Sequence, residues 1–233
     1  MAATDEVQTA IAPEDLFNSV VSIFTRFYPD APTDRFWQAF ELATAAHEGQ
    51  VRQTGEQYIT HPLIVAEILA DYGLDEATLL AAILHDVVED SDYTLEQIEE
   101  QFGEEVALLI DGVTKLDRIK FSTREEQQAA TIRKMAIAMA KDIRVLLIKL
   151  VDRLHNVRTL APLSPEKQER IASETLDVYA PLAHRLGVQE IKHELEERCF
   201  DVLYPKRKRE LEDLVRHRAG ERQEYIDRAM QEV

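Results

Sequence analysis

Two histidines and two aspartates of this 233-residue chain have the types and spacing of a divalent metal site. His85 and Asp86 are adjacent in the motif HDVVED, His61 precedes them in THPL, and Asp152 follows in VDRLHN. Neutral imidazole and carboxylate ligands together suit a borderline cation such as Mn, Fe, Co, Ni or Zn. Four protein ligands leave octahedral positions open for water and a phosphate oxygen, which is a catalytic arrangement. The pattern therefore predicts a metal-dependent phosphohydrolase.

Each of these residues has an ordinary structural explanation when it is considered alone. His61 can cap a helix, Asp152 can pair with Arg153 or Arg158, and a His-Asp dipeptide often occurs by chance. An ionised aspartate inside a buried helix is nevertheless costly without a partner, and a metal ion is one such partner. The combination across several predicted helices favours metal binding over four unrelated roles.

Two further carboxylates, Glu89 and Asp90, follow the His-Asp pair on the same predicted helix. Glu89 is four residues after His85 and Asp90 is four after Asp86, so each is expected one turn further along the same face. Either carboxylate can orient or deprotonate a water there. The alternative is a solvated acidic helix end, which the helix dipole disfavours.

Arg52, Asn156 and Thr159 are the candidate substrate contacts. Arg52 lies in a polar loop before His61, and its guanidinium can bind phosphate. Asn156 should share the helix face of Asp152, where it can hydrogen-bond a base or ribose or cap a neighbouring chain. The weaker cation candidates, for which solvation or a surface ion pair is the simpler explanation, are Arg133, Lys134, Lys149 and Arg158.

Composition and charge narrow the class of protein. The chain is 45% hydrophobic and 30% charged, which indicates a folded protein rather than a disordered one. A formal net charge of −17 disfavours nonspecific binding to nucleic acid or membranes, since both are anionic. The single Cys199 excludes an internal disulfide, and no signal-peptide or membrane-spanning pattern is present. We therefore expect a cytoplasmic protein that binds neither nucleic acid nor membrane directly.

Helical periodicity runs through almost every segment that must position these residues. Asp75 is expected to cap the helix that carries His85, and Thr94 with Gln97 forms a capping box. Residues 49–60 are expected to form a loop or short hairpin. The expected helices begin at or near Pro13, Thr33, Pro62, Asp75, Thr94, Glu104, Asp142, Pro165 and Val188, and the helix that begins at Thr94 is expected to end at Gly103.

Three later segments carry more specific expectations. Residues 119–128 are polar and are expected to form a mobile crossing, followed by a helix over 130–141. The β-branched run 143–151 can pass for a buried strand, but the segment continues beyond strand length and is predicted as helix. Pro181 is expected to end the helix that begins at Ser164-Pro165.

The predicted fold is all-α, with a domain over residues 1–204 and a charged helical tail over 205–233. The tail contains many charged and few apolar residues, which predicts exposed helices that need a partner surface.

Five stretches of the chain resemble the N-terminal hydrolase domain of the RelA/SpoT family of alarmone synthetases and hydrolases. They cover most of residues 40–205 in the family's order. HDVVED together with DRLHNVRTL and YAPLAHRLG is far more specific than a His-Asp pair. The stretches are AAHEGQVRQTGEQYITHP, LLAAILHDVVED, LIDGVTKLD, IRKMAIAMAKDIRVLLIKLVDRLHNVRTL and ETLDVYAPLAHRLG.

The resemblance implies an all-α, HD-type helical bundle that binds Mn²⁺. It also implies removal of the 3′-pyrophosphate from ppGpp or pppGpp, giving GDP or GTP, in stringent-response control. The nucleotide identity comes from the resemblance alone, whereas the metal set follows from the residues as well. The implied metal ligands are His61, His85, Asp86 and Asp152. The implied proton-handling residues are Glu89 and Asp90. The implied nucleotide contacts are Arg52, Asn156 and Thr159.

The chain departs from the family pattern at two positions. Gln53 follows Arg52 where many members have lysine, so a cation that would contact the base or phosphates is missing. Val87 stands where threonine is frequent, and neither change removes a metal ligand. The family's long members carry a synthetase domain next, so we expect a fragment whose tail begins the interdomain helices.

Two alternatives to ppGpp hydrolysis stay open. One is an HD phosphohydrolase of another nucleotide. The other is an alarmone-binding regulatory module without turnover, which the intact HD and ED pairs disfavour and Gln53 mildly favours.

Overall fold

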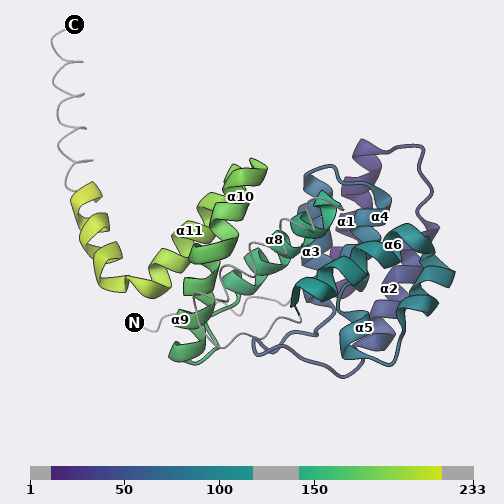
Figure 1. The fold of residues 1–233 in the computed structure, drawn as a ribbon, viewed down its shortest axis with the longest axis horizontal. Coiled ribbons are helices and arrows are strands. Elements are labelled where there is room, and N and C mark those ends of the chain that lie inside the picture. Colours follow the sequence, from purple (N-terminus) through teal and green to yellow (C-terminus); the bar gives the residue numbers. More distant parts are fainter. Residues whose placement is uncertain (1–11, 118–141, 217–233) are drawn as a thin grey trace, which may run out of the picture. The chain divides into compact units, whose positions relative to one another are not determined.

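The computed structural model describes residues 12–117 and 142–216, and its regular elements in these ranges are helices (Figure 1). Val51 and Gln57 form an isolated antiparallel bridge that closes the loop expected over 49–60. The all-α fold class is confirmed. The expected crossing 119–128 and the helix over 130–141, with Arg133 and Lys134, lie outside the described residues.

The chain divides into two compact units, and each is considered by itself. The first unit ends at Leu163 and the second begins at Ser164. This division falls inside the domain expected over residues 1–204, so the limit at residue 204 and the tail 205–233 stay predictions. No helix in the two described ranges is long and apolar enough to cross a membrane.

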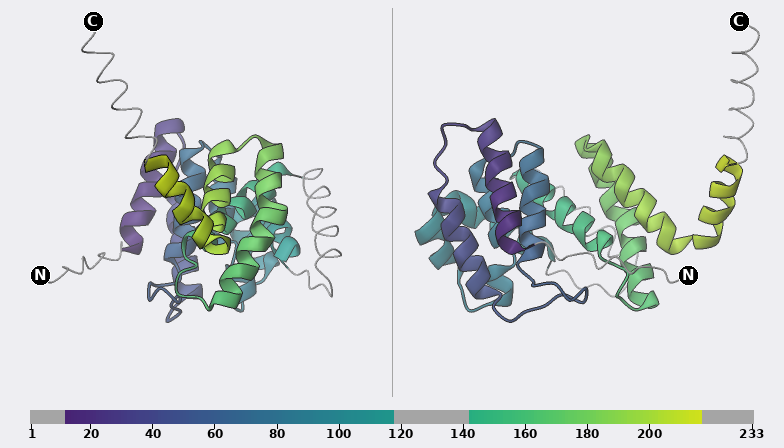
Figure 2. Two further views of the ribbon diagram at one scale, coloured as in Figure 1. Left: turned by 90° about the vertical axis from the view of Figure 1, so that its left-hand side faces the viewer. Right: turned by 180° about the vertical axis from the view of Figure 1, so that it is seen from behind.

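The first unit is built around two neighbouring helices, α3 and α4. Helix α3 packs against α1, α4 and α8, and α4 also packs against α6 and α2 (Figure 2). Every residue of α4 after Glu76 is buried, which is expected of a helix that is apolar on all sides. The helices are α1 (Pro13–Phe27), α2 (Asp34–Ala46), α3 (Thr60–Asp71), α4 (Glu76–Leu84), α5 (Val87–Asp90), α6 (Leu95–Asp117) and α8 (Ile143–Arg158).

Side-chain caps fix the starts of several of these helices. The Asp75 carboxylate accepts a hydrogen bond from the Thr78 amide at 3.0 Å, and Thr94 and Gln97 bond to each other's amides. Both expected caps are confirmed. Thr33 precedes α2 without a side-chain cap, because its backbone (φ −116°, ψ 0°) lacks the extended geometry that such a bond requires.

Residues 143–151 lie within α8, so the prediction of a helix over a strand is confirmed. Gly112 allows α6 to approach α8 closely. A Cβ at position 112 would lie 2.7 Å from a methyl carbon of Val145, closer than side chains tolerate. This close approach to α6 helps to fix the position of α8, which carries Asp152 and Asn156.

The second unit contains α9 (Pro165–Glu174), a π-helical turn η1 (Thr175–Tyr179), α10 (Ala180–Leu186) and α11 (Gln189–Leu203). The prediction that Pro181 ends the helix is wrong. The Ala180 amide bonds to the Thr175 carbonyl, five residues back, and this wide turn precedes the proline that cannot donate a hydrogen bond. The helix ends at Gly187, which has a left-handed backbone (φ 78°). Residues 205–216 are also helical and largely exposed.

Candidate metal centre

The His-Asp pair lies at an interruption between two helices, not inside one. The expected single helix ends as α4 at Leu84, and α5 begins at Val87. The Asp86 carbonyl accepts hydrogen bonds from the amides of Glu89 (3.1 Å) and Asp90 (2.9 Å), which tightens the chain at this point. His85 and Asp86 therefore occupy the link between the buried α4 and the short α5.

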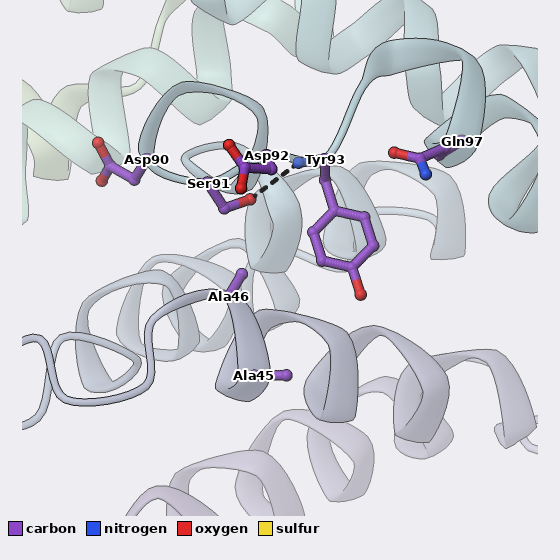
Figure 3. Close-up of a pocket in the computed structure, with 7 residues that line it drawn as sticks. All are labelled: Ala45, Ala46, Asp90, Ser91, Asp92, Tyr93 and Gln97. Carbon is purple, nitrogen blue, oxygen red and sulfur yellow. Dashed lines mark hydrogen bonds between the residues drawn. The ribbon is translucent and has the colours of Figure 1, made fainter.

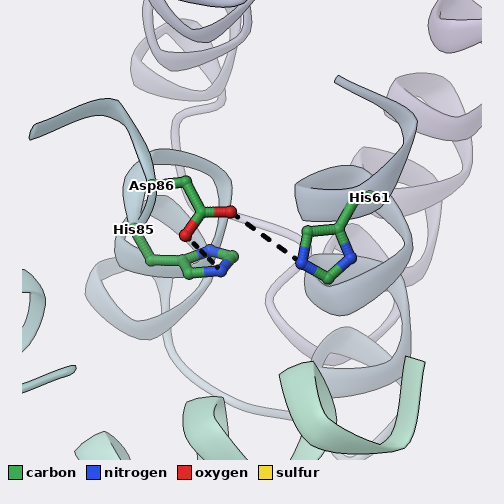
Figure 4. A group of neighbouring side chains, drawn as sticks. All are labelled: His61, His85 and Asp86. Carbon is green, nitrogen blue, oxygen red and sulfur yellow. Dashed lines mark ion pairs between the residues drawn. The ribbon is translucent and has the colours of Figure 1, made fainter. Parts of the chain in front are cut away.

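Three of the four predicted metal ligands converge in the first unit. One ligand atom each from His61, His85 and Asp86 lies within 4.8 Å of the others, and His61 comes from α3 (Figure 4). The His85 Nε2 atom is 3.2 Å from Asp86 Oδ1, and His61 Nε2 is 3.9 Å from Asp86 Oδ2. Ligands about 2.1 Å from a common ion lie up to about 4.2 Å apart, so this spacing is close to that of a metal site.

One ring nitrogen of His85 faces this centre without a hydrogen-bond partner. Its Nδ1 is 2.8 Å from the Ala82 carbonyl, which can only accept a hydrogen bond, so Nδ1 carries the proton. The opposite atom, Nε2, is buried and has no hydrogen-bond partner. A buried polar atom without a partner is costly, and a cation at this position would complete it.

The electrostatics of the His85–Asp86 pair also favour a cation at this position. Burial opposes charge on both groups. The carboxylates of Asp86 and Asp152 outweigh it and raise the pKa of His85, while His85 and His61 lower the pKa of Asp86. A proton on His85 therefore competes with a cation for this site, and metal binding must displace it.

Asp152, the fourth predicted ligand, adjoins the group through His61. Its Oδ1 is 3.1 Å from His61 Nε2 and accepts a hydrogen bond from Asn156 at 2.7 Å. Its Oδ2 pairs with the Lys149 ammonium at 2.6 Å. Burial opposes ionisation, but Lys149 and His61 hold the pKa of Asp152 well below its usual range. The carboxylate therefore stays charged inside the α8 helix.

Tyr58 is a part of the centre that sequence reasoning did not find. Its hydroxyl donates a hydrogen bond to Asp86 Oδ2 at 2.9 Å, and its ring lies against the buried His47. Burial, followed by the Asp86 charge, raises the pKa of Tyr58, so the phenol keeps its proton. The only sequence signal is its position three residues before His61, within the same short loop-to-helix segment.

Glu89 and Asp90 lie beyond the His-Asp pair on α5, and both side chains are exposed. The i to i+4 backbone bond from Asp86 to Asp90 is present, so Asp90 follows Asp86 by one turn as expected. The amide of Glu89 donates to the carbonyl of Asp86, three residues back, instead of to that of His85, four residues back. Asp90 also lines an open pocket of about 570 Å³ (Figure 3). The other lining residues are Ala45, Ala46, Ser91, Asp92, Tyr93 and Gln97.

The three predicted substrate contacts come together in one cluster beside Asp152. A terminal nitrogen of Arg52 donates to Asn156 Oδ1 at 3.2 Å and to the Thr159 hydroxyl at 3.1 Å. Asn156 in turn donates to Asp152, so it joins the cluster to the metal centre. Gln53 is exposed and Val87 is buried.

His155 is the second residue that sequence reasoning missed. It is buried on α8, and the plane of its ring is inclined by 26° to that of the His61 ring, with the two centroids 4.8 Å apart. Burial, and then the nearby His61 and Arg52, lower its pKa to about 3, so the ring is neutral. Its spacing of three residues from Asp152 places both on one helix face, which is the signal that could have found it.

Residues 39–189 match the family model described as HD domain. The chain belongs to the HD-domain family. The match includes the four predicted metal ligands, and the donor set of two imidazoles and two carboxylates fits a borderline divalent cation.

Relatives of this HD-domain chain confirm its resemblance to the RelA/SpoT family. The bifunctional (p)ppGpp synthase/hydrolase SpoT of Escherichia coli K12 is 50% identical over 218 residues, covering 94% of this chain and 31% of that relative. A GTP pyrophosphokinase of Streptomyces coelicolor is 56% identical over 196 residues, covering 84% of this chain and 23% of that relative. The chain thus spans less than a third of the length of these relatives.

One solved structure resembles the HD-domain chain over most of its length. It is that of a metazoan ortholog of SpoT, described as hydrolysing ppGpp and playing a role in starvation responses. The two share a TM-score of 0.56 and 26% sequence identity, over 76% of this chain and 97% of the other.

Proposed function

We propose that this HD-domain chain hydrolyses the 3′-pyrophosphate of ppGpp and pppGpp, releasing pyrophosphate and GDP or GTP. The observation that carries the proposal is the convergence of ligand atoms from His61, His85 and Asp86 within 4.8 Å of one another. The substrate is supported by several relatives at about 50% identity that are named guanosine-3′,5′-bis(diphosphate) 3′-pyrophosphohydrolase. A cytoplasmic location and a synthetase domain in a longer protein belong to the same proposal.

The metal is proposed to be Mn²⁺, held by the three converging ligands and by Asp152. When bound, such a cation polarises a phosphoryl oxygen and lowers the pKa of a bound water. Arg52 would bind phosphate charge, and Asn156 and Thr159 would orient the nucleotide beside Asp152. Closing this cluster on a substrate would require Arg52 to exchange its present partners for phosphate oxygens.

Glu89 and Asp90 would act as general acid and base at the exposed side of the centre. One carboxylate would accept a proton from the attacking water, and the other would assist the leaving group. Their exposure suits this role, because a substrate entering from solvent would pass them before it reached the buried histidines.

A second candidate function is a regulatory module that binds the alarmone without turnover. It is favoured by the relatives that are named GTP pyrophosphokinase at up to 56% identity, and by Gln53 at a position where many members have a cation.

Release of pyrophosphate from ppGpp with added Mn²⁺, measured for the wild type beside Asp86→Ala, tests the proposal. We expect turnover by the wild type and a loss of at least about a hundredfold in the variant, because a ligand to the catalytic cation is removed. Nucleotide binding without turnover in the wild type would support the regulatory module instead. Turnover of other nucleotides but not ppGpp would leave an HD phosphohydrolase of different specificity.

The same assay tests the two acids through Glu89→Gln and Asp90→Asn. Each should bind Mn²⁺ like the wild type and lose about a hundredfold or more in kcat, since general acid–base groups contribute about 10²–10⁴. Asp92→Asn is the matched control, because Asp92 is an exposed acid two residues further on. Full activity in both test variants would remove Glu89 and Asp90 from the mechanism.

A further inference from the structure

His155 lies between the metal centre and the cation of the substrate cluster. Its Nδ1 is 2.6 Å from Nδ1 of His61 and 3.2 Å from a terminal nitrogen of Arg52. The His155 side chain is only 4% exposed, so water does not readily substitute for either contact. The proton positions along this chain are therefore set by the three side chains themselves.

The arginine decides where those protons lie. A guanidinium has five N–H donors and no acceptor, so Arg52 can only donate to His155. Nδ1 of His155 must then carry a lone pair. At 2.6 Å, two facing lone pairs would repel each other, so Nδ1 of His61 carries the proton and donates it to His155.

A neutral imidazole has one N–H, so Nε2 of His61 is left bare. That atom faces Asp152 Oδ1 at 3.1 Å and Asp86 Oδ2 at 3.9 Å. Asn156 and Tyr58 donate to these two oxygens, but in this tautomer no proton lies between the oxygens and Nε2. Three electron-rich atoms that face one another in this way repel each other and would suit a cation. The alternative tautomer, with the proton on Nε2, would satisfy Asp152 but would block the metal-binding nitrogen.

We propose that His155 is a positioning residue that holds His61 in its metal-binding tautomer, and that Arg52 enforces this arrangement from the substrate side. The inference rests on the proposed function, because it assigns the purpose of the bare nitrogen to a cation. It also gives Arg52 a second role besides binding phosphate, which is to donate a hydrogen bond to His155. Partners that fix a ligand's tautomer commonly change metal affinity when they are replaced.

Mn²⁺ affinity, followed by the EPR signal of free Mn²⁺, tests the proposal in three variants. His155→Phe keeps a buried ring without an acceptor and should weaken binding about 10- to 100-fold. His155→Asn offers its Oδ1 as an acceptor near the former Nδ1 and should recover most of the affinity. His47→Phe is the control, because it also replaces a histidine that is 4% exposed but does not alter the partner of His61.

The tautomer itself is read from long-range ¹H–¹⁵N correlations of the metal-free protein labelled at histidine. We expect the His61 proton on Nδ1 in the wild type and in His155→Asn, and a shift toward Nε2 in His155→Phe. A wild-type proton on Nε2 would overturn the inference, even if a variant failed to fold.

The two proposals fail in distinguishable ways. If the wild type does not bind Mn²⁺, the proposed metal is overturned. The NMR measurement of the His61 tautomer would then still show whether His155 fixes the proton of His61 on Nδ1. Wild-type binding that is equally tight in His155→Phe would overturn the role of His155 and leave the proposed function standing.

Discussion

At the scale of single residues, the charge of the centre is balanced by a buried lysine. The Lys149 ammonium lies 2.6 Å from Asp152 Oδ2, and both side chains are less than a tenth exposed. The sequence favoured ordinary solvation for Lys149, and the structure shows a buried ion pair instead. Such a pair is strongly coupled, because removing one member leaves the other charge buried without its oppositely charged partner.

We expect Lys149→Met to lower the free energy of unfolding of the metal-free protein by about 3–5 kcal/mol. Saturating Mn²⁺ should narrow this difference, because the cation would become an alternative partner for Asp152. Urea denaturation with and without the metal measures both effects. Lys115→Met removes an exposed ion pair with Asp111 and should cost about 1 kcal/mol or less. Equal losses in the two variants would contradict a special role for the buried pair.

At the scale of elements, helix α8 carries one predicted metal ligand, Asp152, and one predicted substrate contact, Asn156, and it ends at a second, Thr159. Its start is fixed by Asp142, whose carboxylate accepts from the Arg144 amide at 2.9 Å and pairs with the Arg144 guanidinium. These bonds, opposed only in part by desolvation, lower the pKa of Asp142 below 3.8. A group with a lowered pKa in the folded state stabilises the fold above its unfolded pKa and loses that contribution as the pH falls.

We expect Asp142→Ala to lower the free energy of unfolding by about 1–2 kcal/mol near neutral pH, through loss of the helix cap. Asp142→Asn should lose less, because its side-chain oxygen can still cap Arg144. The gap between wild type and Asp142→Asn should close as the pH falls from 3.8 through the lower pKa of the folded state, below which the aspartate is protonated in both states. Denaturation curves at neutral pH and well below pH 3.8 measure this. A gap that does not change with pH would show that the ionised carboxylate contributes nothing.

At the scale of the whole molecule, every described residue of the candidate site belongs to the first compact unit, which ends at Leu163. The predicted metal ligands come from α3, the α4–α5 link and α8, which are far apart in sequence and packed together in space. A cation bound by all three segments would tie them into one cooperative element. The second unit, from Ser164 onward, contributes no predicted ligand.

We therefore expect Mn²⁺ to slow amide hydrogen exchange in α3, α4 and α8 and to leave α9 and α11 unchanged. At a concentration about a hundred times the Kd, binding to one site stabilises the folded unit by about 2.7 kcal/mol. Exchange followed by mass spectrometry locates the protected segments, with Asp86→Ala as the control that should show none. Equal slowing in both units would mean that the cation acts elsewhere or throughout the chain.

The sequence by itself determined most of the helices and which residues are the candidate metal ligands. Caps such as Asp75 and the Thr94–Gln97 box act within three residues, so local chemistry is enough to predict them. The apolar, buried character of the segment before His85 also follows from composition. The His-Asp pair and the two other candidate ligands could be proposed from the sequence because only a few residue types bind metals.

Tertiary structure alone decided how those ligands are supported. Tyr58 and Asp86 are 28 positions apart, and His61 and His155 are 94 apart, so neither contact leaves a periodic signal in the sequence. The break between α4 and α5 at His85 and the π-helical turn before Pro181 also could not be predicted from the sequence. Both replace the regular helical hydrogen-bond pattern locally, and helical periodicity does not reveal such a change. Packing of α3 against α8 brings the imidazoles of His61 and His155 together, and this contact allows His155 to fix the tautomer of His61.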